Sequence, residues 1–112
     1  LKLQKRAARV GFDWPEIYQV LDKIGEETEE LIEAKKTEPQ ERVNEEFGDL
    51  MFSIVNLGRH LKVDPEEALK QTNRKFINRF KFVEESIRSR GKKIEDTSLE
   101  EMEGLWQQAK DL

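Results

Sequence analysis

Helix-start signals occur at three places in this chain and separate long segments whose apolar residues recur at helical spacing. Asp13 to Glu16 offers a capping Asp, a Pro in the first turn and a Glu three residues after the cap. Asp64 to Glu67 repeats this pattern, and Ser98 to Glu101 adds a third capping box. No segment shows the apolar–polar alternation of a half-buried strand over a useful length. These features predict an all-α protein.

The apolar spacing also predicts where the helices lie. We expect helices over about 15–36, 40–61, 65–89 and 99–110, preceded by a short basic lead-in helix over 1–9. Pro39 disfavours helix at the residue before it, and Gly91 is expected to stop the third long helix. A chain of 112 residues is long enough for one ordinary core. We therefore expect a single domain over 1–112, with 1–10 as its lead-in, folded as a small bundle of four to five helices.

The helix expected over 40–61 is apolar nearly all round between Leu50 and Leu57, which implies burial on several sides. Helices of this length exceed ~30 Å, and a monomer of this size has only a limited core with which to cover them. The sequence therefore predicts a homodimer whose helices complete one another's core.

Composition excludes several classes of function. There is no Cys, so disulfides, Cys-zinc sites and thiol catalysis are ruled out, and the single His60 excludes sites that need several histidines. His60 itself is expected at a helix end or on the surface. The longest apolar stretch is far shorter than the ~20 residues that span a bilayer. The chain carries no visible signal peptide and begins with Leu1, so we expect a cytoplasmic fragment that does not associate with membranes.

Charge is distributed unevenly along the chain. Residues 16–49 hold 12 acids and 4 bases, a net charge of −8, whereas residues 70–93 hold 9 bases and 2 acids, a net charge of +7. Two interpretations are open: salt bridges between helices of a solvated bundle, or a site that holds a cation on one wall and an anion on the other. The overall net charge of −4 and the lack of interleaved aromatics in the basic segment disfavour a nucleic acid partner.

Two pairs of carboxylates are spaced three residues apart, Glu27 with Glu30 and Glu46 with Asp49, so each pair shares one helical face. A solvated acidic face is one interpretation of the first pair. However, Glu27 lies at the edge of its helix's apolar stripe, where a carboxylate is costly unless it is paired or binds a metal. Four carboxylates without a soft ligand suit Mg²⁺ or Mn²⁺.

A polar stripe continues along the second of these helices. Its members follow one another at helical spacing on an otherwise apolar segment: Glu46, Asp49, Ser53 and Asn56. Such a stripe is typical of a helix that lines a site or an interior hydrogen-bond network. A di-iron centre would require Glu three residues before His60, and Leu57 stands there.

The same residues resemble a known family. Glu26 to Glu30 reads EExxE, and after 15 residues Glu46 to Asp49 reads ExxD. This order resembles the signature of the all-α nucleoside triphosphate pyrophosphohydrolases, and with Val10 to Pro15 and Lys75 to Phe80 the chain resembles a MazG domain. The lead-in from Leu3 to Gly11 is similar to the start of the second domain of two-domain MazG proteins.

The resemblance implies Mg²⁺-dependent hydrolysis of nucleoside triphosphates between the α and β phosphorus atoms, broad in base, with Mn²⁺ as a possible substitute metal. By motif position, the implied metal ligands are Glu27, Glu30, Glu46 and Asp49, and Glu26 would position or deprotonate water. The implied nucleotide contacts are Arg42, Lys75 and Arg79 for phosphates, Asn78 for ribose or phosphate, and Trp106 for stacking on the base.

Two alternatives to this function remain. The chain could be a non-catalytic helical dimer whose acidic helices bind a partner protein. It could also be a base-specific relative that hydrolyses dUTP, dCTP or phosphoribosyl-ATP.

Overall fold

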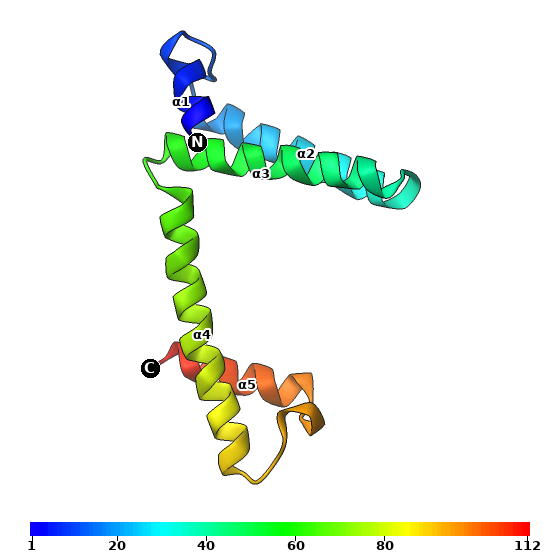
Figure 1. Ribbon diagram of the computed structural model, residues 1–112, viewed down its shortest axis with the longest axis vertical. Helices are drawn as coiled ribbons and strands as arrows, with labels where there is room; N and C mark the ends of the chain where they lie inside the picture. The colour runs from blue at the N-terminus through cyan, green and yellow to red at the C-terminus, as the bar shows by residue number, and fades with distance from the viewer. The chain divides into compact units, whose positions relative to one another are not determined.

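A computed structural model describes all 112 residues, and they form helices and loops with no strand. The elements, in chain order, are α1 (Lys2–Arg9), α2 (Ile17–Thr37), α3 (Gln40–His60), α4 (Pro65–Ser89), the 3₁₀ helix η1 (Ile94–Asp96) and α5 (Leu99–Lys110) (Figure 1). Each α-helix begins and ends within two residues of the expected bounds. The all-α prediction is confirmed. None of these helices is both long enough and apolar enough to cross a bilayer.

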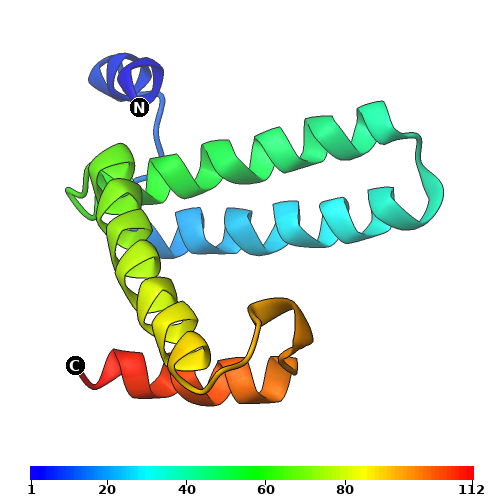
Figure 2. The ribbon, with the colours of Figure 1, turned by 60° about the horizontal axis from the view of Figure 1, so that its bottom comes forward.

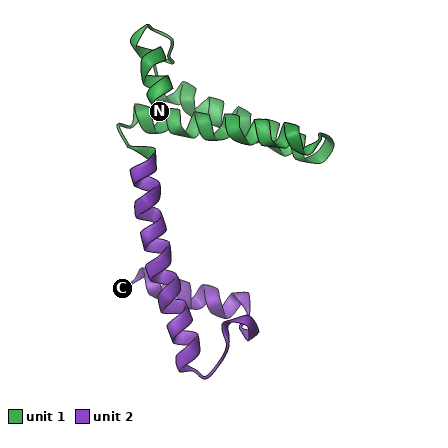
Figure 3. Cartoon of the chain, in the orientation of Figure 1, with its two compact units in different colours: residues 1–65 green, residues 66–112 purple.

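The chain divides into two compact units, residues 1–65 and residues 66–112 (Figure 3). The first unit holds α1, α2 and α3, and the second holds nearly all of α4 together with η1 and α5. The single domain expected over 1–112 stays a prediction.

In the first unit, α2 and α3 lie side by side and antiparallel (Figures 1 and 2), joined by a short turn at Pro39. The face that α3 buries is polar: its buried residues are Glu46, Ser53 and Asn56. Four of its large apolar side chains, Phe47, Met51, Phe52 and Ile54, are about half exposed, whereas Leu50 and Leu57 are partly buried. Three of the four residues of the predicted polar stripe are therefore interior in this unit, whereas Asp49 is exposed, and the apolar face of α3 is left uncovered within the unit.

The start of α2 differs from the expected cap. The N-cap is Glu16, whose backbone N–H donates to Gln19 Oε1 at 3.4 Å. Asp13 Oδ1 instead accepts from the backbone N–H of Trp14 at 2.8 Å and from Arg59 Nη2 on α3 at 2.5 Å. The prediction that Asp13 caps this helix was wrong, because α2 begins only at Ile17, with Glu16 as its N-cap, and the Asp13 carboxylate accepts from Arg59 instead. Asp13 thus fixes the loop before α2 to the end of α3.

His60 is the last residue of α3, as expected, and its Nε2 lies 3.2 Å from Asp13 Oδ1. Partial burial opposes ionisation of Asp13, but the hydrogen bonds from Arg59 and His60 outweigh it and lower the pKa of Asp13. The carboxylate form is therefore favoured by folding.

A lowered pKa for Asp13 predicts acid sensitivity of this contact. Stability contributed by Asp13 is complete above the ordinary aspartate pKa of about 4 and is lost as pH falls through the lower folded value. We expect the free energy of unfolding to fall less steeply below about pH 4 in Asp13→Asn than in the unchanged chain. Urea unfolding at several pH values measures this, with the exposed Asp22→Asn as control. Equal slopes for Asp13→Asn and the unchanged chain would contradict it.

The second unit has its own small core. Val83 and Ile87 of α4 and Leu105 of α5 are each no more than 3% exposed, and Ile94, Met102 and Trp106 pack against them. In Figure 2, α5 lies across the end of α4. Helical spacing in α4 and α5 thus produces one apolar contact between two consecutive helices.

The connection between α4 and α5 follows the sequence signals closely. Helix α4 ends at Ser89, and Gly91 adopts a φ of +73°, a left-handed conformation that favours glycine. Ser98 Oγ accepts from the backbone N–H of Glu101 at 3.2 Å, so the third expected N-cap is confirmed. The Glu101 side chain also pairs with Arg90 and Lys92.

Candidate metal centre

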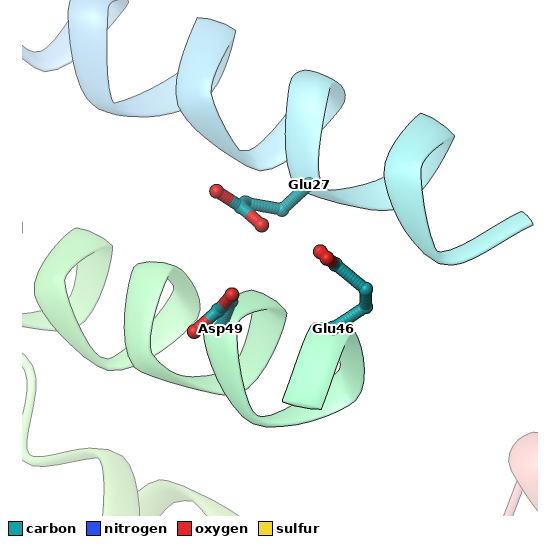
Figure 4. A group of neighbouring side chains, drawn as sticks. All are labelled: Glu27, Glu46 and Asp49. Carbon is teal, nitrogen blue, oxygen red and sulfur yellow. The ribbon is translucent and has the colours of Figure 1, made fainter. Parts of the chain in front are cut away.

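Three carboxylates meet between α2 and α3. Glu27 from α2 and Glu46 and Asp49 from α3 each offer an oxygen, and these oxygens lie within 4.8 Å of one another (Figure 4). Glu27 and Glu46 extend toward each other across the space between the two helices. The i,i+3 spacing of Glu46 and Asp49 brings both to the face of α3 that meets α2.

Two of these carboxylates are deeply buried. Glu27 is 5% exposed and Glu46 is 3% exposed, whereas Asp49 is exposed. Glu27 Oε1 pairs with Lys23 Nζ at 2.8 Å, and Glu46 Oε1 pairs with Arg42 Nη2 at 2.7 Å. The second oxygen of each, Oε2, is buried and has no hydrogen-bond partner.

A buried carboxylate oxygen without a partner is costly, and two in one cluster are harder to explain by packing alone. A divalent cation bound among the three carboxylates would supply the missing partner for both oxygens. Oxygen ligands without nitrogen or sulfur suit a hard cation. The donor set and the orphaned oxygens therefore fit a metal.

Lys23 was not found by the sequence analysis. Its hydrogen bond to Glu27 raises the pKa of Lys23, so the ammonium stays charged beside the carboxylates. The only signal was the i,i+4 spacing of Lys23 and Glu27, which is also typical of an ordinary surface pair. Arg42, which was predicted to bind phosphate, lies in the corresponding position on α3, with Glu45 and Glu46 both paired to it.

Glu30 and Glu26 lie outside the three-carboxylate group. The charge of Glu27 raises the pKa of Glu30, and hydrogen bonding to Glu46 raises it further, so Glu30 is an electrostatic neighbour of the cluster. Glu26 is 65% exposed at its side chain and lies 3.8 Å from Lys23 Nζ. The structure thus brings together three of the four expected ligands in one tight group.

Cavities adjoin the cluster on two sides. One of about 310 Å³ is lined by Lys23, Glu27 and Asp49 together with Trp14. Another of about 460 Å³ is lined by Glu30, Arg42 and Glu46, among others. A ligand could therefore approach the carboxylates without displacing either helix.

The remaining expected nucleotide contacts belong to the second unit. Lys75 and Asn78 are exposed on α4, while Arg79 is partly buried with its guanidinium carbon 5.9 Å from the centre of the Trp106 ring. Trp106 also contacts Phe76, at 5.3 Å between ring centres. Trp106 therefore packs against the small core of this unit and also contacts Arg79 on α4.

The comparisons with known proteins agree with one another. Residues 16–83 match the MazG nucleotide pyrophosphohydrolase domain family. The chain is 50% identical over 109 residues to the nucleoside triphosphate pyrophosphohydrolase/pyrophosphatase MazG of Thermotoga maritima. It is 46% identical over 111 residues to the nucleoside triphosphate pyrophosphohydrolase of Escherichia coli K12.

Each of these alignments covers 97% of this chain but only 42% of the relative, so the chain spans about two fifths of the length of the curated relatives it matches. The matched residues 16–83 include Glu27, Glu46 and Asp49, and also Lys75 and Arg79 of α4. On the family match and on identity over almost its whole length, this chain belongs to the MazG nucleotide pyrophosphohydrolase family.

Proposed function

We propose that this chain hydrolyses nucleoside triphosphates to nucleoside monophosphate and pyrophosphate, with Mg²⁺ as its metal. The observation that carries the proposal is the group of Glu27, Glu46 and Asp49. Each places an oxygen within 4.8 Å of the others, and Glu27 and Glu46 each hold a buried Oε2 without a partner. Both curated relatives are named for this reaction.

Glu27, Glu46 and Asp49 would hold the metal, with Glu30, the electrostatic neighbour of Glu27 and Glu46, as a fourth ligand. Mg²⁺ matches an all-carboxylate set with water completing the octahedron, and Mn²⁺ would substitute. When bound, the metal would neutralise phosphate oxygens and lower the pKa of a bound water. Glu26 is exposed and lines the cavity of about 460 Å³, and it is the proposed residue that orients or deprotonates the attacking water.

The cations of the chain would bind the triphosphate. Lys23 and Arg42 lie beside the carboxylates. Glu27 pairs with Lys23, and Glu45 and Glu46 both pair with Arg42, so both cations keep their charge. From the second unit, Lys75 and Arg79 share a face of α4 and would stabilise the negative charge of the departing pyrophosphate. Asn78 would contact ribose or phosphate, and Trp106 would stack on the base.

We also propose that the chain acts as a homodimer. On α3, Phe47, Met51 and Ile54 lie on one face at helical spacing, and each is about half exposed. Helix α2 leaves Tyr18, Leu21 and Ile32 exposed in the same way. Apolar faces of this extent are stabilised by removal from water, and a second copy offers a matching face.

A pyrophosphate-release assay tests the proposed reaction. With Mg²⁺ and each of the four common nucleoside triphosphates, we expect monophosphate and pyrophosphate in equal amounts and no orthophosphate. Activity should be lost in EDTA and restored by Mg²⁺ or Mn²⁺, because the buried carboxylates need the cation. Release of orthophosphate, or equal rates in EDTA, would contradict the proposal.

A further inference from the structure

Lys23 and Arg42 hold the two buried carboxylates of the metal centre in the same way. Each cation lies four residues before its glutamate, Lys23 before Glu27 on α2 and Arg42 before Glu46 on α3. This order of charges is the less favourable one for a helix, since a Glu that precedes its Lys stabilises an i,i+4 pair more than the reverse. Helix stability alone therefore does not account for the two pairs.

Each pair engages only one oxygen of its carboxylate. Lys23 Nζ lies 2.8 Å from Glu27 Oε1, and Arg42 Nη2 lies 2.7 Å from Glu46 Oε1. Such short contacts are typical of charge-assisted hydrogen bonds. In both glutamates the other oxygen, Oε2, is buried and has no hydrogen-bond partner. The two oxygens of each carboxylate are thus divided, because a cation of the chain occupies Oε1 and Oε2 is left for a metal.

An occupied Oε1 limits how each glutamate can bind a metal. A metal ion on the same oxygen would be repelled by the ammonium or guanidinium that is already there. Glu27 and Glu46 are deeply buried, at 5% and 3% exposed, so breaking either pair would leave a buried charge without its partner. Each glutamate is therefore restricted to one metal-binding oxygen while its pair persists.

The number of oxygens that a carboxylate offers affects the choice of metal. Mg²⁺ requires a near-ideal octahedron and usually binds one or two carboxylates together with several waters. Ca²⁺ takes more oxygens in a flexible geometry and accepts carboxylates that bind through both oxygens. A site whose glutamates each offer a single oxygen therefore favours Mg²⁺, and release of the second oxygens would benefit Ca²⁺ more than Mg²⁺.

We propose that Lys23 and Arg42 select Mg²⁺ against Ca²⁺ by keeping Glu27 and Glu46 monodentate. The inference rests on the proposed function and deepens it, because it concerns how the same metal centre chooses its ion. Both cations act through the carboxylates, so in this role they are positioning residues. Their other N–H groups stay available for phosphate, since an ammonium and a guanidinium each carry several donors.

Lys23→Met tests the inference, because it removes the ammonium and frees Glu27 Oε1 while it keeps an unbranched apolar side chain. Isothermal titration calorimetry without nucleotide gives the Kd of Mg²⁺ and the Kd of Ca²⁺ for the variant and the unchanged chain. The lost positive charge affects both divalent ions alike, so it cancels in the ratio of the two constants. We expect the Kd for Ca²⁺ divided by the Kd for Mg²⁺ to fall about tenfold.

A second variant and a control accompany this measurement. Arg42→Met makes the same change beside Glu46 and should move the ratio in the same direction. Lys36→Met is the matched control, since Lys36 on α2 pairs with the exposed Glu33 at 3.6 Å and should leave the ratio unchanged. Circular dichroism shows whether each variant is folded.

The outcomes separate this inference from the proposed function. An unchanged ratio in a folded Lys23→Met or Arg42→Met variant would overturn the inference, as would an unchanged chain that binds Ca²⁺ as tightly as Mg²⁺. Either result, together with Mg²⁺-dependent release of pyrophosphate, leaves the proposed function standing. An unchanged chain that binds neither ion would overturn the metal centre and the inference together.

Discussion

Replacing Asp49 by Asn is expected to lower the rate of pyrophosphate release at least about a hundredfold, because a bound metal contributes several kcal/mol to such a reaction. The variant removes one of the three carboxylates that lie within 4.8 Å, and it keeps the size of the side chain. Asp49 is the exposed member of the group, so its replacement disturbs neither of the ion pairs that the two buried carboxylates make. The measurement is kcat with saturating Mg²⁺ and nucleoside triphosphate.

The same variant separates loss of function from loss of fold. Without metal, three carboxylates in close contact repel one another, so Asp49→Asn should unfold at the same or a slightly higher temperature than the unchanged chain. Adding Mg²⁺ at a hundred times its Kd should stabilise the unchanged chain by about 2.7 kcal/mol and the variant far less. Thermal unfolding with and without Mg²⁺ measures both effects.

Glu41→Gln is the matched control, since it removes one negative charge from an exposed position of the same helix. It should retain the activity and the Mg²⁺-dependent stabilisation of the unchanged chain. Full activity in Asp49→Asn, or equal stabilisation by Mg²⁺ in Asp49→Asn and the unchanged chain, would show that these carboxylates do not hold the metal.

The helices were predictable because their signals are local. Ser98 caps α5 as its capping box indicates, and α4 ends where Gly91 can adopt a positive φ. Asp13 shows where local signals fail: its partner Arg59 is distant in sequence, and the helix begins at Ile17, three residues later than a cap at Asp13 would place it. A capping motif describes only what the neighbouring residues can offer, and a tertiary partner can offer more.

The candidate site was predictable for a similar reason. Glu46 and Asp49 are one helical turn apart, so their common face follows from the sequence alone. The distance between Glu27 and the α3 pair depends on how α2 packs against α3, which no spacing rule supplies. Lys23 was missed because its i,i+4 relation to Glu27 is common on solvated helices, and only the 5% exposure of Glu27 distinguishes it from such a pair.

The surface of α3 carries the second large prediction. Ile54 is 49% exposed on the face it shares with Phe47 and Met51, opposite in character to the buried polar face with Glu46 and Asn56. Because the polar side of this helix packs against α2, its apolar side is the face that a second copy would contact. Ile54→Glu is therefore expected to raise the dimer dissociation constant by about a hundredfold or more, the cost of placing an unpaired charge in an apolar contact.

Sedimentation equilibrium over a range of protein concentrations measures this dissociation constant, and Gln40→Glu, an exposed polar position on the same helix, is the control that should leave it unchanged. Diluting the unchanged chain below its dissociation constant should also lower the unfolding temperature, because the exposed faces of α2 and α3 then return to water. An unchanged chain that is monomeric at every concentration would contradict the dimer, and so would an Ile54→Glu variant that dimerises as tightly as the control. The contrast between the two faces of α3 makes this a strong test, since a contiguous exposed apolar patch on a helix is typical of an interaction site.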